Sequence, residues 1–198
     1  MRAPEFWNNA PERPGIAARL LAPLGALYGI GTARRMRGKG GYRAGIPVIC
    51  VGNISAGGTG KTPTVIALAQ RVADGTHVVT RGHGGRLEGP VRVDPAKHEA
   101  EDVGDEPLLI AAFAPVWVAK DRAAGLRAAE AAGAKRVLLD DGFQNPSVIK
   151  TASIVVVDAA RGFGNGRCIP AGPLREPAPV GLARADLVLT VGPEEMQD

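Results

Sequence analysis

Residues 46–63 read Ile-Pro-Val-Ile-Cys-Val-Gly-Asn-Ile-Ser-Ala-Gly-Gly-Thr-Gly-Lys-Thr-Pro, and this stretch decides the fold. The apolar run over 46–51 predicts a strand, the glycines predict a tight loop, and the pattern that follows predicts a helix over 61–73. A strand, a glycine loop, Lys-Thr and a helix in this order form a phosphate-binding P-loop, whose pattern is G-x-x-x-x-G-K-[ST]. Ser55 stands at the first glycine position, and the rest of the pattern matches. The alternative, a glycine-rich surface turn, does not account for Lys-Thr in register.

Each part of this loop has a chemical task. Glycines let the backbone curl so that several N–H groups point at one phosphate, and the helix N-terminus adds the positive end of a dipole. We expect Lys61 to reach the β- and γ-phosphate oxygens and the Thr62 hydroxyl to bind Mg²⁺. The predicted nucleotide-binding residues are Ser55, Ala56, Gly57, Gly58, Thr59, Gly60, Lys61 and Thr62.

Strands and helices alternate through the rest of the chain. Further strands are predicted over 77–80, 116–119, 136–140, 154–158 and 187–191, a short edge strand over 90–94, and helices over 103–113 and 122–132. Strands that are nearly continuous in Val, Ile and Leu indicate a parallel sheet covered on both faces. The predicted fold class is therefore α/β: a P-loop NTPase-type parallel sheet with helices on both faces, preceded by an N-terminal amphipathic helix.

Charge separates the N-terminal segment from the remainder. The chain carries +4, but residues 1–43 hold eight Arg or Lys and two Glu, so they carry +6 and the other 155 residues carry −2. A nucleic-acid-binding body would spread its basic residues over a face, so nucleic acid is not an expected partner. A short basic arm fits an anionic membrane surface. Two cysteines are too few for a disulfide scaffold and indicate a reducing, cytosolic compartment.

Residues 20–33 contain no charged side chain, and their apolar positions follow helical spacing. Spanning a bilayer takes about 20 apolar residues, so we expect this helix, weakened by Pro23 and Gly25, to lie in the interface. Two alternatives stay open: a helix packed on its own domain, or a cleaved signal peptide, which the following basic residues disfavour. The predicted domains are 1–43, a membrane-interface helix and linker, and 44–198, a nucleotide-binding kinase domain.

Acidic residues follow two of the predicted elements. Asp140 and Asp141 end an apolar strand, as in a Walker-B arrangement, and are predicted to bind Mg²⁺. Asp105 is either a helix cap or the carboxylate that a kinase needs to accept a hydroxyl proton. Farther along, Arg175 is a candidate to neutralise phosphoryl charge and Glu176 to join the metal shell, although the pair also fits an exposed turn.

The glycine loop 81–85 follows the second predicted strand of the sheet, at the edge where α/β sheets bind ligands. Arg81 is a candidate to bind an anionic substrate group. His83 is either a substrate contact or a solvated side chain.

In their order along the chain, these motifs resemble the tetraacyldisaccharide 4′-kinase family, the lipid A 4′-kinases of Gram-negative bacteria. The matching segments are Phe6-Trp7, Leu27-Tyr28, 51–63, 80–85, 104–109, 140–144, 158–166 and 169–176. The resemblance implies transfer of the ATP γ-phosphate, with Mg²⁺, to the 4′-hydroxyl of a tetraacyldisaccharide 1-phosphate, which gives lipid IVA. It also implies a location at the cytoplasmic face of the inner membrane.

The resemblance also implies roles for single residues. Asp105 is similar to the family's acceptor-activating base, and Asp140, Asp141, Glu106 and Glu176 to its metal and electrostatic shell. Arg175 and Arg122 resemble the family's phosphate-side cations, and Gln144 lies beside the site. Arg81 and His83 stay substrate candidates by their position after the second strand.

The chain departs from the family at three points. His83 replaces a common Tyr, Asn145 replaces a common His, and the sequence ends at Asp198, whereas family members continue and supply a His that partners the base. We therefore expect an N-terminal fragment or a truncated product. The alternative function is a P-loop GTPase acting as a nucleotide switch or metallochaperone, but residues 183–187 lack the Asn and Lys of its base-reading motif.

Overall fold

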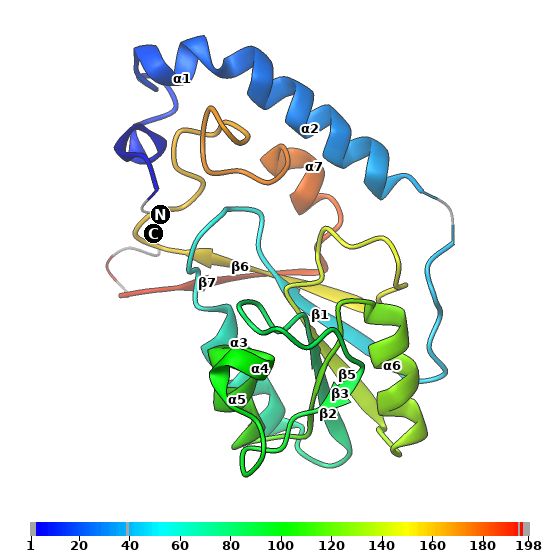
Figure 1. Cartoon of the computed structure of the whole chain (residues 1–198). Coiled ribbons are helices and arrows are strands. Elements are labelled where there is room, and N and C mark those ends of the chain that lie inside the picture. The colour runs from blue at the N-terminus through cyan, green and yellow to red at the C-terminus, as the bar shows by residue number, and fades with distance from the viewer. Residues whose placement is uncertain (1–2, 39, 194, 196–198) are drawn as a thin grey trace. The chain divides into compact units, whose positions relative to one another are not determined.

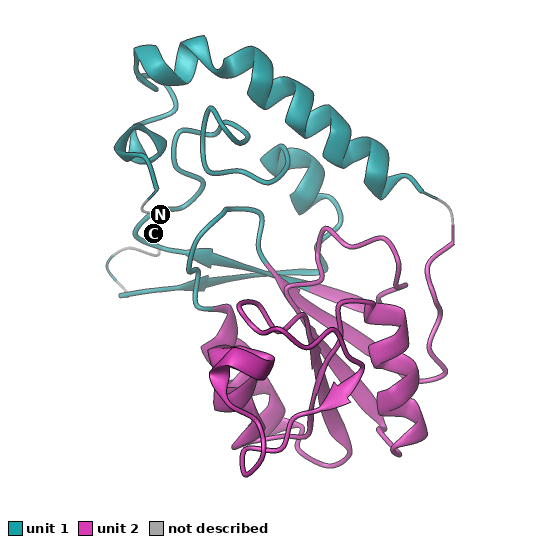
Figure 2. Cartoon of the chain, in the orientation of Figure 1, with its two compact units in different colours: residues 1–38, 53–60, 154–198 teal, residues 39–52, 61–153 magenta. Residues whose placement is uncertain are grey.

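The computed structural model describes residues 3–38, 40–193 and 195. The chain forms two compact units, coloured teal and magenta in Figure 2. Unit 1 consists of Met1–Gly38, Asn53–Gly60 and Ile154–Asp198, and unit 2 of Lys39–Gly52 and Lys61–Ser153. This division differs from the predicted boundary after residue 43, because the N-terminal helices belong with the P-loop glycines and the C-terminal part.

Unit 2 is built on a mostly parallel sheet. Its strands run in the order β3, β4, β2, β5, β1, and all neighbours are parallel except β3 and β4. The strands are β1 (Val48–Gly52), β2 (Thr76–Thr80), β3 (Val91–Arg92), β4 (Val116–Val118) and β5 (Arg136–Asp140). The central strands β2 and β5 are almost fully buried, which explains their continuous apolar sequence. The short edge strand predicted over 90–94 is confirmed as β3.

Helices cover both faces of this sheet, as predicted. Figure 1 shows α3 to α5 on one side of the strands and α6 on the other. α3 packs on β1, β2 and β5, α5 packs on β4, and α6 packs on β2 and β4. Their bounds are α3 (Lys61–Arg71), α4 (Ala100–Val103), α5 (Asp105–Ala111) and α6 (Arg122–Ala131).

The single helix predicted over 103–113 is wrong, because the chain breaks at Gly104. This residue has φ 92°, which ends α4 and starts α5 one residue later. A Cβ at Gly104 would also lie 2.5 Å from the carbonyl oxygen of His83. The break therefore brings the glycine loop 81–85 against the start of α5.

Unit 1 contains two parallel strands and four short or medium helices among its described residues. They are η1 (Glu5–Asn8), α1 (Ile16–Leu20), α2 (Ala22–Met36), β6 (Ala152–Asp158), α7 (Ala178–Leu182) and β7 (Leu187–Val191). The buried side chain of Asn165 donates to the carbonyl oxygens of Phe6 (3.1 Å) and Ala171 (2.9 Å). It thereby fastens η1 to the loop after β6.

The N-terminal helix packs through small residues. The helix breaks at Leu21, with Pro23 in the first turn of α2, as the weakness predicted there suggests. Gly25, Gly29 and Thr32 are buried, and a Cβ at Gly25 would lie 2.7 Å from the carbonyl oxygen of Cys168. The large apolar residues face the solvent, with Leu20 75% exposed. Within the described part of the chain, every helix is too short or too polar to cross a bilayer.

Candidate functional site

Two carboxylates stand at the carboxyl end of β5 in unit 2. Asp140 is 2% exposed, and the Thr80 hydroxyl donates to its Oδ2 over 3.0 Å. Its Oδ1 is buried and has no hydrogen-bond partner among the described residues. Burial raises the pKa of Asp140 to about 6, and the Thr80 hydrogen bond only partly opposes this rise. A buried carboxylate oxygen without a hydrogen-bond donor is suited to bind a cation.

Asp141 is held in an unusual backbone conformation. Its φ is 50°, and it is the one non-glycine residue with positive φ in the described ranges. Its N–H donates to the carbonyl oxygen of Val51 over 3.0 Å, which ties it to β1. The Lys61 ammonium lies 3.7 Å from its Oδ1. Such strain persists only where the surroundings impose it and often marks a functional site.

A buried arginine stands at the start of α6. Arg122 is 4% exposed, and its Nη1 donates to the carbonyl oxygen of Ala119 over 2.9 Å. Its Nε is buried without a hydrogen-bond partner in the described part of the chain. Burial lowers the pKa of Arg122, nearby Arg81 lowers it further, and Asp141 and Asp140 oppose this. A desolvated guanidinium with an unused donor is suited to bind an anion.

The first turn of α5 adds two exposed acids, Asp105 and Glu106. The negative charge of Glu106 contributes to the raised pKa of Asp140, so the two carboxyls share one electrostatic site. His83 is exposed in the loop that packs on Gly104, and Gln144 is half-buried after Asp141. Unit 2 thus groups predicted residues from five parts of the sequence, namely Lys61, Arg81, Glu106, Arg122 and Asp140 with Asp141.

The P-loop glycines belong to unit 1, where a second predicted motif lies beside them. Gly57 and Gly60 have φ values of 119° and 81°, which side chains other than glycine rarely adopt. The Asn53 amide donates to Thr59 Oγ1 over 3.1 Å and braces the loop from inside. The N–H of Arg175 donates to the carbonyl oxygen of Ile54 over 2.7 Å. This contact places the predicted phosphate cation Arg175 next to the loop.

Glu176, a predicted metal ligand, has a different partner in unit 1. Its side chain is 1% exposed, and both of its carboxylate oxygens accept from the Arg184 guanidinium, one of them over 2.6 Å. A buried carboxylate needs such a partner. Its place in the metal shell stays a prediction.

Open space adjoins the P-loop glycines within unit 1. A cavity of about 290 Å³ is lined by Ser55, Ala56, Gly58 and Thr59 of the loop, and by Trp7 and Arg161 among other residues. The Trp7 indole N–H donates to the carbonyl oxygen of Pro170 over 3.0 Å, which fixes this wall. The backbone of the loop is therefore accessible to a ligand.

Sequence reasoning missed two supporting residues. Thr80 ends β2 in parallel register with β5, where Val79 pairs with Leu139, so the next residues, Thr80 and Asp140, stand side by side. That pairing was available from the predicted strand ends. Asn53 carried no comparable signal, because its contact depends on how the loop curls.

A parallel α/β sheet, a P-loop after β1 and paired carboxylates at the end of neighbouring β5 define a P-loop nucleotide-binding protein. The sequence pattern of the family Tetraacyldisaccharide-1-P 4'-kinase matches residues 17–198. The chain belongs to this family, as its motifs predicted.

Individual relatives agree with this assignment. The tetraacyldisaccharide 4'-kinase of Dinoroseobacter shibae is 67% identical over 200 residues, which cover 100% of this chain and 59% of that relative. The one from Rhodospirillum rubrum is 56% identical over 196 residues, which cover 97% of this chain and 58% of that relative. A crystal structure of the "apo" form of LpxK from Aquifex aeolicus in complex with ATP has TM-score 0.80 and 29% identity, covering 92% of this chain and 61% of that one. The chain thus spans about three fifths of their length. None of these comparisons favours the GTPase alternative.

Proposed function

We propose that this chain is part of an ATP-dependent kinase that phosphorylates the 4′-hydroxyl of a tetraacyldisaccharide 1-phosphate to give lipid IVA. The observation that carries the proposal is the grouping of Lys61, Asp141 and the buried Asp140 at the carboxyl end of β5. Lys61 is the last residue but one of the P-loop, and the fold brings it within 3.7 Å of the Asp141 carboxylate. The grouping supplies a cation for phosphate oxygens and carboxylates for a metal.

ATP would be held by the backbone N–H groups of 55–60, with Lys61 on its β- and γ-phosphates. Thr62, Asp140 and Asp141 are the proposed Mg²⁺ ligands, with Glu106 and Glu176 in the surrounding shell. The unpartnered Asp140 Oδ1 supports a hard cation at this place. When bound, Mg²⁺ neutralises charge on the β- and γ-phosphates.

Asp105 is the proposed base. The acceptor's 4′-oxygen bonds to the γ-phosphorus, and the bond from that phosphorus to the β–γ bridging oxygen breaks, so ADP leaves with the electron pair. The hydroxyl proton passes to the Asp105 carboxylate. Arg122 and Arg175 would stabilise charge on the transferring group. Arg81, His83 and Gln144 would contact the phosphorylated disaccharide.

Lys61→Ala tests the nucleotide site. We expect calorimetry to detect magnesium-ATP binding to the native chain and at least tenfold weaker binding to this variant, with an unchanged circular dichroism spectrum. Unaltered affinity in Lys61→Ala would remove the P-loop from the proposal. In the longer protein, Asp105→Ala should lower kcat and leave ATP affinity intact, whereas a loss of ATP affinity alone would exclude Asp105 as the base.

The N-terminal helices are the proposed attachment to the cytoplasmic face of the inner membrane. Ile16, Leu20, Leu24, Leu27 and Ile30 are exposed, between 53% and 79% each. Arg19 lies among them and Arg34 and Arg35 follow in the last turn of α2, which suits an anionic interface. The proposal therefore keeps residues 1–43 as a membrane-interface segment and 44–198 as the kinase part.

Sedimentation with liposomes tests the attachment. The triple variant Leu20→Ser, Leu24→Ser, Leu27→Ser should lose binding to vesicles containing an anionic lipid, and the native chain should bind neutral vesicles less well. Equal sedimentation of variant and native chain would refute the attachment.

A further inference from the structure

Lys150 reaches from the segment before β6 to the loop that follows the paired carboxylates. Its Nζ donates to the carbonyl oxygen of Asn145 over 2.5 Å and makes a longer contact of 3.5 Å to that of Phe143. Lys150 is half-buried, so this ammonium is not a freely solvated surface charge. One cation thus holds two carbonyls of the loop 142–147.

The base of the Lys150 side chain is fixed to β1. The N–H of Thr151 donates to the carbonyl oxygen of Val48 over 2.8 Å, and the N–H of Val48 donates to Thr151 Oγ1 over 3.0 Å. One residue before Lys150, the N–H of Ile149 donates to the carbonyl oxygen of Tyr42 over 2.9 Å. The residues on both sides of Lys150 are therefore fixed by hydrogen bonds.

The loop that Lys150 holds directly follows the strained Asp141. Phe143 is 2% exposed and packs on the end of β1, because a Cβ at Gly52 would lie 2.5 Å from the Cβ of Phe143. The N–H of Asn145 donates to the carbonyl oxygen of Gly142 over 3.0 Å, which closes a tight turn. This turn follows Asp141 directly, so it is one of the contacts that hold this residue at φ 50°.

We propose that Lys150 is a positioning residue that clamps the loop 142–147 and so keeps the Asp141 carboxylate in place for magnesium-nucleotide. This inference rests on the proposed function, because it gives Asp141 a metal-linked role. Residues that orient metal ligands without touching the metal commonly change metal affinity about 10- to 100-fold when removed.

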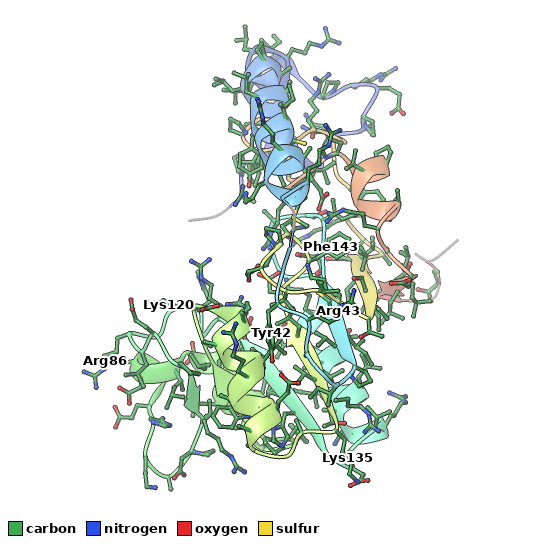
Figure 3. All side chains as sticks on the ribbon, turned by 90° about the vertical axis from the view of Figure 1, so that its right-hand side faces the viewer. Tyr42, Arg43, Arg86, Lys120, Lys135 and Phe143 are labelled. Atoms are coloured by element: carbon green, nitrogen blue, oxygen red, sulfur yellow. The ribbon has the colours of Figure 1, made fainter. Side chains whose placement is uncertain are left out.

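Lys150→Met tests the clamp, since it removes the ammonium and keeps an apolar stem. The readout is the ratio of ATP dissociation constants measured by calorimetry with EDTA and with Mg²⁺. We expect this ratio to fall about tenfold or more in Lys150→Met and to recover in Lys150→Arg. The control is Lys135→Met, which removes an exposed lysine paired with Asp74 toward the opposite end of unit 2 from Phe143 (Figure 3).

The outcomes separate the two proposals. A native chain that binds no magnesium-ATP refutes the proposed function. A native chain that binds it, with an unchanged ratio in Lys150→Met or an equal fall in Lys135→Met, refutes the role of Lys150 alone. Should Lys150→Met lose its native circular dichroism spectrum, the same ratio in Lys150→Gln decides.

Discussion

Replacing Asp140 by Asn should stabilise the metal-free protein while removing its binding of magnesium-nucleotide. The pKa of this carboxyl is 3.8 in its ordinary state and about 6 in the folded protein. Because the pKa is higher in the folded state, the protonated carboxyl contributes to the stability of the fold. This contribution is fully present below pH 3.8 and is lost as the pH rises through 6. The difference of roughly 2 pKa units corresponds to about 3 kcal/mol at pH 7.

Urea unfolding in EDTA between pH 4 and pH 8 measures this effect. The free energy of unfolding of Asp140→Asn should exceed that of the native chain by up to about 3 kcal/mol at pH 7 and by much less at pH 4. The amide oxygen can still accept from Thr80, so the variant leaves that donor paired. Asp74→Asn is the control, because Asp74 is exposed and its pKa is lowered by Lys135. A pH-independent difference, or a less stable Asp140→Asn, would refute the reasoning.

Three further predictions concern packing and reactivity. Gly25→Ala should lower the free energy of unfolding by about 1–3 kcal/mol, because its Cβ meets a backbone oxygen at 2.7 Å. Gly31→Ala, whose Cβ would have nothing within 4 Å, should raise the free energy of unfolding by up to about 1 kcal/mol. Equal urea midpoints for the two variants would contradict this. Glu130→Ala removes the carboxylate that accepts from the Tyr42 hydroxyl and from the N–H of Gly45, so trypsin should cleave after Arg43 (Figure 3) severalfold faster. An unchanged cleavage rate would show that these two hydrogen bonds do not hold the segment. Burial raises the pKa of Cys50 to about 12, so at pH 8 its thiol should react at least about 10³-fold more slowly than a free cysteine until the protein is unfolded; fast labelling of the native chain would count against it.

The sequence predicted the strands well because they are continuous apolar runs, which leave few alternatives. Arg136–Asp140, which is buried, and Leu187–Val191, which is largely exposed, were both predicted to the residue. The helix over 103–113 failed at Gly104, which has φ 92° and lies against the loop 81–85. The hydrophobic periodicity of a short window cannot predict a contact between segments about 20 residues apart.

The sequence predicted which residues form the candidate site better than it predicted which side chains contact one another. Lys61, Asp140 and Asp141 are grouped as expected, because strand ends of a parallel sheet meet at one edge. The pairing of Glu176 with Arg184 was not foreseen. Its partner is eight residues away across the short helix α7, which has no strong sequence signal.

The two faces of α2 use different side chains, and this separation offers a practical route to biochemistry. The buried residues of α2 are the small ones, Gly25, Gly29 and Thr32. The bulky side chains on the other face can be exchanged for Gln or Lys without creating a void inside the protein. A detergent-free preparation for crystallisation should therefore be obtainable by redesigning one side of one helix.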